Sequence, residues 1–198
     1  MTVKRICVFC GSSPGSDPQY AKAAESLGAL LAQKKIGLVF GGGKVGMMGR
    51  LARAALKHGG EVIGVIPREL YDKQVAMVGL ADLRVVGTMH ERKALMAELA
   101  DGFMALPGGL GTLEEIFEML TWAQLGMHGK PCGLLDVAGY FTPLLAFLDR
   151  VAEQGFIDRA HRSMILSGAD PQELLRRFDL YEPPAADKAA WALGLGDA

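Results

Sequence analysis

Three glycine-rich segments follow short apolar runs and have the composition of phosphate-binding turns. They are CGSS at residues 10–13, GGG at residues 41–43 and PGGLGT at residues 107–112. Glycine lets the backbone approach a ligand closely, and free amides at the start of a following helix donate hydrogen bonds to an anion. One such turn is a weak signal, and for residues 41–43 a tight turn without a ligand remains the alternative. Three in one chain predict a site for a phosphorylated small molecule.

Cations and carboxylates lie beside two of the expected helix starts. Arg92 and Lys93 lie near the start of a predicted helix, where the helix dipole disfavours positive charge, so we expect them to meet an anion or a carboxylate. The alternative is a solvated cationic helix face. Glu114 and Glu115 follow the third glycine turn. An acid near a helix start often only complements the helix dipole, but this explains one acid better than two adjacent ones.

The order of the predicted elements indicates how these side chains come together. The strands that precede Arg92 and Glu115 are consecutive in the chain, so we expect adjacent strands to bring both residues to one crevice. In that position an ion pair should lower the pKa of the Glu115 carboxyl. Thr112 is expected to cap the following helix and to offer its hydroxyl to a phosphate. An arginine beside a carboxylate in a phosphate-binding crevice suits cleavage of a nucleotide-like substrate.

Apolar runs alternate with helical patterns along the chain. We expect strands at residues 5–9, 37–40, 61–66, 83–86, 102–106 and 131–136. Helices are expected from a cap at Ser16 or Asp17 onward and at residues 46–57, 90–99, 112–125, 140–154 and 171–178. This alternation predicts an α/β protein: a doubly wound parallel sheet in a three-layer α/β/α sandwich. We expect one domain over residues 1–182 and a loosely ordered tail over residues 183–198.

Composition and charge narrow the class of protein. The 198 residues are half hydrophobic and 22% charged with a net charge of −1, which excludes a disordered chain and argues against nucleic acid as a partner. No run of 18 apolar residues is present, so no membrane span is expected. The apolar stretch from Ile6 to Cys10 is too short for a signal-peptide core, which predicts a cytoplasmic protein.

Two motifs suggest other chemistries but fit them poorly. Cys7 and Cys10 have CxxC spacing, yet residues three apart in a strand point to opposite faces, so a redox pair is disfavoured. Gly41, Gly43 and Gly46 match the dinucleotide-binding GxGxxG pattern. The acid about the right distance on, Glu61, begins the next strand and lies at the wrong edge for a ribose. The histidines lack HxxxH spacing, so no metal site is predicted.

At this point the sequence resembles a known family. PGGLGTLEE at residues 107–115 matches a PGGxGTxxE motif, and MHERK at residues 89–93 matches a second motif in the expected order. Both are typical of the LOG (LONELY GUY) phosphoribohydrolases, which are often mislabelled as lysine decarboxylases. The resemblance runs from Ile6 to about Tyr140 and includes the GGGKVGMMG and TWAQLG segments.

The resemblance implies a Rossmann-like fold, a homodimer and no cofactor. It implies hydrolysis of the N-glycosidic bond of a nucleoside 5′-monophosphate, a cytokinin riboside 5′-monophosphate or AMP, to a free base and ribose 5-phosphate. By motif position it gives catalytic roles to Arg92 and Glu115. It gives substrate-binding roles to Lys93, Gly109, Leu110, Gly111, Thr112, Leu113, Glu114 and Thr121, and the glycine turns add Gly11, Ser12, Gly42, Gly43 and Gly108.

One substrate-binding position departs from the family. Plant members carry a glutamate where this chain has Gln74, which keeps an acceptor but loses the charge. This puts affinity or base preference in question and leaves the chemistry intact. The alternative is that Gln74 lies on a loop that tolerates change.

The sequence alone leaves open both the role of Glu115 and the choice of function. Its carboxylate could stabilise a positively charged sugar, bind ribose hydroxyls or activate water. The main rival function is a non-catalytic nucleotide carrier or sensor, which leaves Arg92 and Glu115 without a task. A pyridoxal-dependent decarboxylase would need a Schiff-base lysine, for which only Lys44 and Lys93 are candidates.

Overall fold

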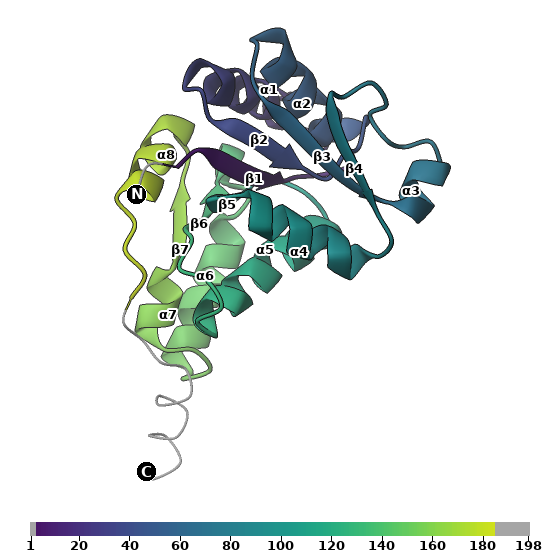
Figure 1. Cartoon of the computed structure of the whole chain (residues 1–198). Helices are drawn as coiled ribbons and strands as arrows, with labels where there is room; N and C mark the ends of the chain where they lie inside the picture. Colours follow the sequence, from purple (N-terminus) through teal and green to yellow (C-terminus); the bar gives the residue numbers. More distant parts are fainter. Residues whose placement is uncertain (1–2, 185–198) are drawn as a thin grey trace.

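Seven parallel strands form a single sheet in a computed structural model that describes residues 3–184. The spatial order is β4-β3-β2-β1-β5-β6-β7, so the chain winds outward from β1 to β4 and then returns to build the other half (Figure 1). The strands are β1 (Arg5–Phe9), β2 (Gly37–Phe40), β3 (Val62–Pro67), β4 (Asp82–Val86), β5 (Gly102–Ala105), β6 (Cys132–Leu135) and β7 (Ile165–Gly168). This confirms the doubly wound parallel sheet.

Helices cover both faces of the sheet (Figure 1). They are α1 (Pro18–Gln33), α2 (Gly46–Lys57), α3 (Arg68–Asp72), α4 (Met89–Leu99), α5 (Leu110–Gln124), α6 (Thr142–Glu153), α7 (Arg159–Ser163) and α8 (Pro171–Asp179), with the short 3-10 turn η1 (Val137–Gly139) before α6. Buried residues of α1, α2 and α8 form one core layer, and buried residues of α4 and α5 form the other. The three-layer sandwich is therefore confirmed.

Strict alternation along the central strand divides its side chains between the two layers. Ile6, Val8 and the following Cys10 join the core under α1 and α2, whereas Cys7 and Phe9 join the core under α4 and α5. Cys7 and Cys10 thus lie on opposite sides of the sheet, and both are free and buried. Burial raises the pKa of both thiols, which is the opposite of what a reactive cysteine needs.

The sequence prediction missed four short elements and misplaced two helix starts by two residues each. The missed elements are α3, α7, η1 and β7, each of only three to five residues, and β7 is an edge strand that is only partly buried. Helix α6 begins at Thr142 rather than at Tyr140. Helix α5 begins at Leu110 with Gly109 as its N-cap, so Thr112 is not the cap that we expected. Thr112 instead lies in the first turn with its side chain buried. Asp17 does cap α1, by accepting from the backbone N–H of Gln19.

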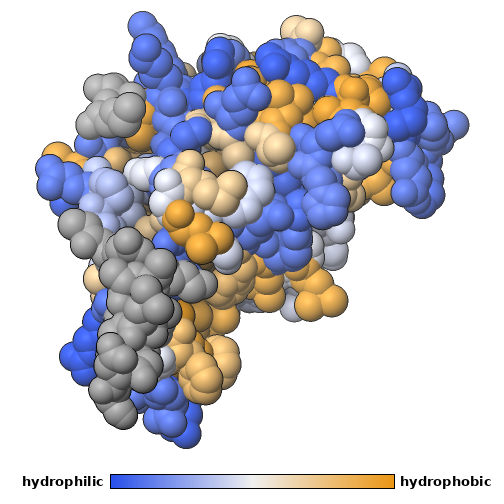
Figure 2. Space-filling view, turned by 60° about the horizontal axis from the view of Figure 1, so that its bottom comes forward, coloured by the Kyte–Doolittle hydropathy of each residue, from blue (hydrophilic) through white to orange (hydrophobic). Residues whose placement is uncertain are grey.

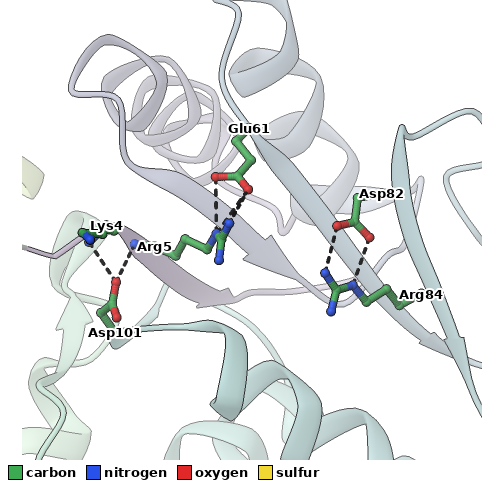
Figure 3. A network of polar contacts seen from close by, with 6 residues as sticks. All are labelled: Lys4, Arg5, Glu61, Asp82, Arg84 and Asp101. Carbon is green, nitrogen blue, oxygen red and sulfur yellow. Dashed lines mark hydrogen bonds and ion pairs between the residues drawn. The ribbon is translucent and has the colours of Figure 1, made fainter.

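Charged side chains at the amino edge of the sheet pair with one another (Figure 3). Arg5 contacts Glu61 at 2.8 Å, and Arg84 contacts Asp82 at 3.0 Å. Asp101 accepts a hydrogen bond from the backbone N–H of Arg5 at 2.9 Å. Glu61 therefore serves the edge opposite the glycine turns, which confirms that it does not complete a dinucleotide-binding motif.

The region of the predicted loose tail falls, from residue 185 on, outside the described residues. Within residues 3–184 no helix is long and apolar enough to span a membrane.

Candidate active site

The three glycine turns meet at the carboxyl edge of the sheet. The N–H of Gly11 in the first turn donates to the carbonyl of Pro107 in the third at 3.1 Å. The carbonyl of Gly11 accepts from the N–H of Met47, just after the second turn, at 3.1 Å. Gly46 has a φ of +59°, and a Cβ on it would lie 2.2 Å from the backbone of Ser12. Gly11 and Ser12 therefore sit between the other two turns.

The third turn leaves unpaired amides at the start of α5. Gly109 is the N-cap, and no side chain among residues 3–184 caps the helix there. The first N–H groups of a helix have no intrahelical partner, so those of Leu110, Gly111 and Thr112 remain available to a ligand. A Cβ on Gly109 or Gly111 would meet nothing within 4 Å, whereas one on Gly108 would lie 2.1 Å from Oγ1 of Thr112. The turn is packed on its inner side and open on its outer side.

A pocket of about 280 Å³ lies between the first and third turns. Its glycine-turn walls come from residues 11–13 and 107–109, and its other walls include Met47 and the rings of Tyr20 and Tyr140. The two rings pack edge to face with centroids 5.6 Å apart. The sequence prediction did not single out either tyrosine for this site. Tyr140 follows β6 at the same carboxyl edge as the glycine turns, which is the signal that would have found it.

Arg92 lies in the first turns of α4 and contacts both β3 and α5. Its Nε donates to the carbonyl of Val65 in β3 at 3.1 Å, and its Nη1 donates to Oε1 of Glu115 at 2.5 Å. Arg92 is 7% and Glu115 8% exposed, so the ion pair is almost fully removed from water. A Cβ on Gly41 would lie 2.1 Å from Nη2 of Arg92, which explains why this position in the second turn has no side chain.

Arg92 and Glu115 therefore meet as predicted, but the reason that we gave for it is wrong. Strands β4 and β5, which precede α4 and α5, are consecutive in sequence but separated in the sheet by β3, β2 and β1. Because β4 is an edge strand, α4 must cross back over β3, β2 and β1 to reach β5. This crossing places α4 beside α5 on the same face (Figure 1), and the long Arg92 side chain spans the remaining gap.

The pKa of Glu115 is raised above its ordinary value of 4.5, contrary to the expectation from an ion pair alone. Burial is the largest cause, because it disfavours the charged carboxylate. The charge and hydrogen bond of Arg92 act in the opposite direction but do not fully offset it. The Glu115 carboxyl therefore keeps its proton to a higher pH than a glutamate at the surface does.

Lys93 is held by two acids on α5. Its Nζ contacts Glu114 and lies 3.0 Å from Oε2 of Glu118, and its side chain is 6% exposed. Burial by itself would lower the pKa of Lys93, but the hydrogen bonds to both acids outweigh it and the pKa is raised. The sequence prediction missed Glu118, which lies one helical turn after Glu114 and so faces the same way. A protonated lysine of this kind is poorly suited to forming a Schiff base.

Other predicted substrate-binding residues lie farther out. Gln74 is exposed with a φ of +59°, after α3, and the adjacent Val75 accepts at 2.9 Å from the N–H of Lys44 beside the second turn. In that second turn the carbonyl of Gly42 accepts from Met77 at 2.8 Å, and Gly43 packs against Met48. The loop that bears Gln74 is thus fixed to the rim of the site.

The side chains of three predicted substrate-binding residues of α5 do not line the pocket between the first and third turns. Leu110 is 87% exposed, and Leu113 packs toward the core. Thr121 is exposed and donates its hydroxyl to the carbonyl of Phe117 at 2.7 Å. It lies 11 residues beyond Leu110, roughly 16 Å along the helix axis. The fold of one chain therefore does not bring Thr121 to the glycine turns.

Fold and site together define a class of protein. A doubly wound parallel sheet with amide-bearing turns and a buried Arg–Glu pair at its carboxyl edge is the arrangement of a Rossmann-like protein that acts on a small phosphorylated ligand. Among residues 3–184, no group of three or more His, Cys, Asp or Glu side chains is placed to hold a metal ion.

Comparison with known proteins identifies the family. Residues 48–178 match a family model described as "Possible lysine decarboxylase". Cytokinin riboside 5′-monophosphate phosphoribohydrolase LOG7 of Arabidopsis thaliana is 49% identical over 180 residues, which cover 91% of this chain and 83% of the relative. The probable cytokinin riboside 5′-monophosphate phosphoribohydrolase LOGL9 of Oryza sativa subsp. japonica is 50% identical, covering 91% and 79%. The chain belongs to this LOG family.

Solved structures confirm the fold at lower sequence identity. The molybdenum cofactor binding protein of Rippkaea orientalis superposes with a TM-score of 0.68 at 23% identity, covering 91% of this chain and 98% of that one. The molybdenum cofactor carrier protein of Chlamydomonas reinhardtii gives 0.67 at 20% identity, covering 89% and 96%. At these identities the likeness concerns the Rossmann-like architecture alone.

Proposed function

We propose that this protein is a phosphoribohydrolase that cleaves the N-glycosidic bond of a nucleoside 5′-monophosphate. The substrate is a cytokinin riboside 5′-monophosphate or AMP, and the products are the free base and ribose 5-phosphate. The buried contact between Arg92 and Glu115, beside open amides at the start of α5, carries the proposal. Membership of a family whose curated relatives bear this activity in their names supports it.

The phosphate is anchored by the glycine turns. The free amides after Gly109 and the positive end of the α5 dipole favour a dianion at this point. Binding energy from the non-reacting phosphate then orients the sugar so that its anomeric carbon faces the catalytic pair.

The catalytic pair acts on the positive charge of the sugar. Breaking the bond between C1′ and the base nitrogen develops an oxocarbenium-like transition state. The Glu115 carboxylate stabilises that charge, and Arg92 holds the carboxylate ionised and in position through its contact at 2.5 Å. A water oxygen then bonds to C1′, and a proton from that water ends on the departing base.

A non-catalytic carrier on the same fold is the alternative. A carrier function accounts for the glycine turns but gives no role to the buried ion pair. Removing two charges from water is costly, so a buried ion pair is not explained by a contribution to stability. Binding of AMP without formation of ribose 5-phosphate would favour the carrier.

The test is product analysis with AMP and isopentenyl-AMP side by side. Glu115→Gln keeps the shape of the side chain and removes its charge, so we expect base release to be abolished while nucleotide binding survives. Unchanged turnover would remove Glu115 from the mechanism. Adenosine, which lacks the phosphate, should react with a kcat/KM about a hundredfold or more lower than AMP, because charge-assisted hydrogen bonds are lost. Equal rates would refute the phosphate anchor.

We further propose that the protein works as a cytoplasmic homodimer. Leu110, the first residue of α5, is 87% exposed, and Leu125, its C-cap, is 55% exposed. Thr121 lies between them along the same side of the helix. Figure 2 brings forward the lower side of Figure 1 and shows hydrophobic patches reaching the surface between hydrophilic ones. Pairing through this stripe would give Thr121 the substrate-binding role that the fold of one chain does not.

A further inference from the structure

Tyr140 makes a contact with the third glycine turn that no catalytic or binding role described above uses. Its hydroxyl donates to the carbonyl of Gly108 at 2.6 Å, across the wall of the pocket between the first and third turns. The ring is 39% exposed and is held edge to face against Tyr20 and against Phe141. The phenol is therefore fixed in place and faces the site.

The segment that carries Tyr140 is itself anchored. Asp136 at the end of β6 accepts from the N–H of Phe141 at 2.6 Å and from the hydroxyl of Thr142 at 2.8 Å. Ala138 adopts a φ of +52° so that the chain can turn within η1. The left-handed conformation of Ala138 and the hydrogen bonds to Asp136 thus hold the phenol at the carboxyl edge of the sheet.

The carbonyl of Gly108 and the N–H of Gly109 belong to one peptide unit. In a trans peptide these two groups point in opposite directions, and no peptide bond among residues 3–184 is cis. Glycine on both sides of the unit removes the Cβ atoms that would otherwise restrict a rotation of this plane. Without a partner for the carbonyl, the plane could turn and present an oxygen, rather than an N–H, to an anion.

We infer that Tyr140 is a positioning residue for phosphate binding: its hydroxyl fixes the Gly108–Gly109 peptide so that the N–H of Gly109 joins the amides at the start of α5. This inference deepens the proposed function and depends on its phosphate anchor. The hydroxyl affects binding of the phosphate rather than cleavage of the N-glycosidic bond, because the turn that it holds contacts the phosphate and not that bond.

The test compares Tyr140→Phe with Tyr181→Phe. Tyr140→Phe keeps the ring contacts and removes only the bond to Gly108, so we expect KM for AMP to rise about tenfold with kcat within about twofold. The dissociation constant for ribose 5-phosphate, measured by calorimetry on the intact protein, should rise by a similar factor, whereas that for adenosine should stay unchanged. Tyr181→Phe also removes one tyrosine hydroxyl, but Tyr181 follows α8 and does not line the pocket. This control should leave KM, kcat and both dissociation constants near those of the wild type.

Two results would overturn the inference. One is an unchanged affinity of Tyr140→Phe for ribose 5-phosphate; the other is an equal loss of affinity for adenosine, which would indicate general damage to the site. Turnover of AMP by the wild type tests the proposed function separately. If the wild type binds ribose 5-phosphate but releases no base, the hydrolase proposal fails while the calorimetry still decides the role of Tyr140.

Discussion

A buried carboxylate beside a guanidinium is subject to two opposing effects on its pKa. In Glu115 the loss of hydration raises the pKa, and Arg92 only partly reverses this. Glu173 on α8 also pairs with an arginine, Arg176 at 2.7 Å, but it remains in solvent and its pKa is lowered. The two pairs differ in burial rather than in partner, so burial decides the direction.

This contrast gives a measurable prediction at the residue scale. In a carbon-13 NMR titration of the side-chain carboxyls, Glu115 should have a midpoint above 4.5 and Glu173 a midpoint below it. The signal that disappears in Glu115→Gln assigns the first, and Glu173→Gln assigns the second. A Glu115 midpoint at or below 4.5 would contradict the burial argument.

The direction of the shift also fixes two pH dependences. If the ionised carboxylate is the active form, base release falls as pH drops through the raised pKa of Glu115. For folding the sign is reversed: the folded chain holds this proton more tightly, so the contribution of Glu115 to the free energy of unfolding is greatest below 4.5 and is lost as pH rises through the folded pKa.

At the scale of elements, glycines in the second turn and at the start of α2 serve two different purposes. Gly41 leaves room for the guanidinium of Arg92, which is the far end of a flexible side chain. Gly46 has a positive φ and packs against the backbone of Ser12, which cannot easily move. Substituting alanine at Gly41 should therefore affect mainly catalysis, whereas alanine at Gly46 should affect mainly stability.

We expect Gly46→Ala to lower the free energy of unfolding by at least about 2 kcal/mol, because a left-handed conformation and a backbone clash add. Gly41→Ala should change stability less but lower turnover of AMP on the order of a hundredfold, since it displaces Arg92 from Glu115. Urea unfolding and a ribose 5-phosphate assay on both variants measure the two effects. Wild-type turnover in Gly41→Ala would show that the position of the guanidinium does not matter.

At the scale of the whole molecule, the proposed homodimer would pair through the exposed stripe along α5. Leu125→Asp should shift the protein from dimer to monomer in analytical ultracentrifugation, because a charge in an apolar interface is costly. Phe147→Asp is the matched control, since Phe147 is 60% exposed on α6 and outside the stripe. If the wild type sediments as a monomer, the proposed homodimer is wrong. If the Leu125→Asp variant remains a dimer, the interface does not lie on the stripe of α5.

The local pattern of the sequence was enough to predict most of the fold. The bounds of β1, β2 and α2 were predicted correctly, because alternating or continuous apolar runs and glycine stops are local signals. The short edge strand β7 was not, because four partly buried residues carry little periodicity. The order of the elements likewise predicted that Arg92 and Glu115 belong to one site, but the expected adjacency of their strands was wrong.

What the chain alone determines is therefore the set of strands, helices and glycine turns, together with the chemical types of the groups that follow them. Only the tertiary structure decides that α4 crosses three strands to lie beside α5, that burial raises the pKa of Glu115, and that the hydroxyl of Tyr140 meets the carbonyl of Gly108. The physical reason is range: propensity and periodicity act between near neighbours in sequence. Strand order, desolvation and a contact between residues 32 positions apart depend on how distant segments pack.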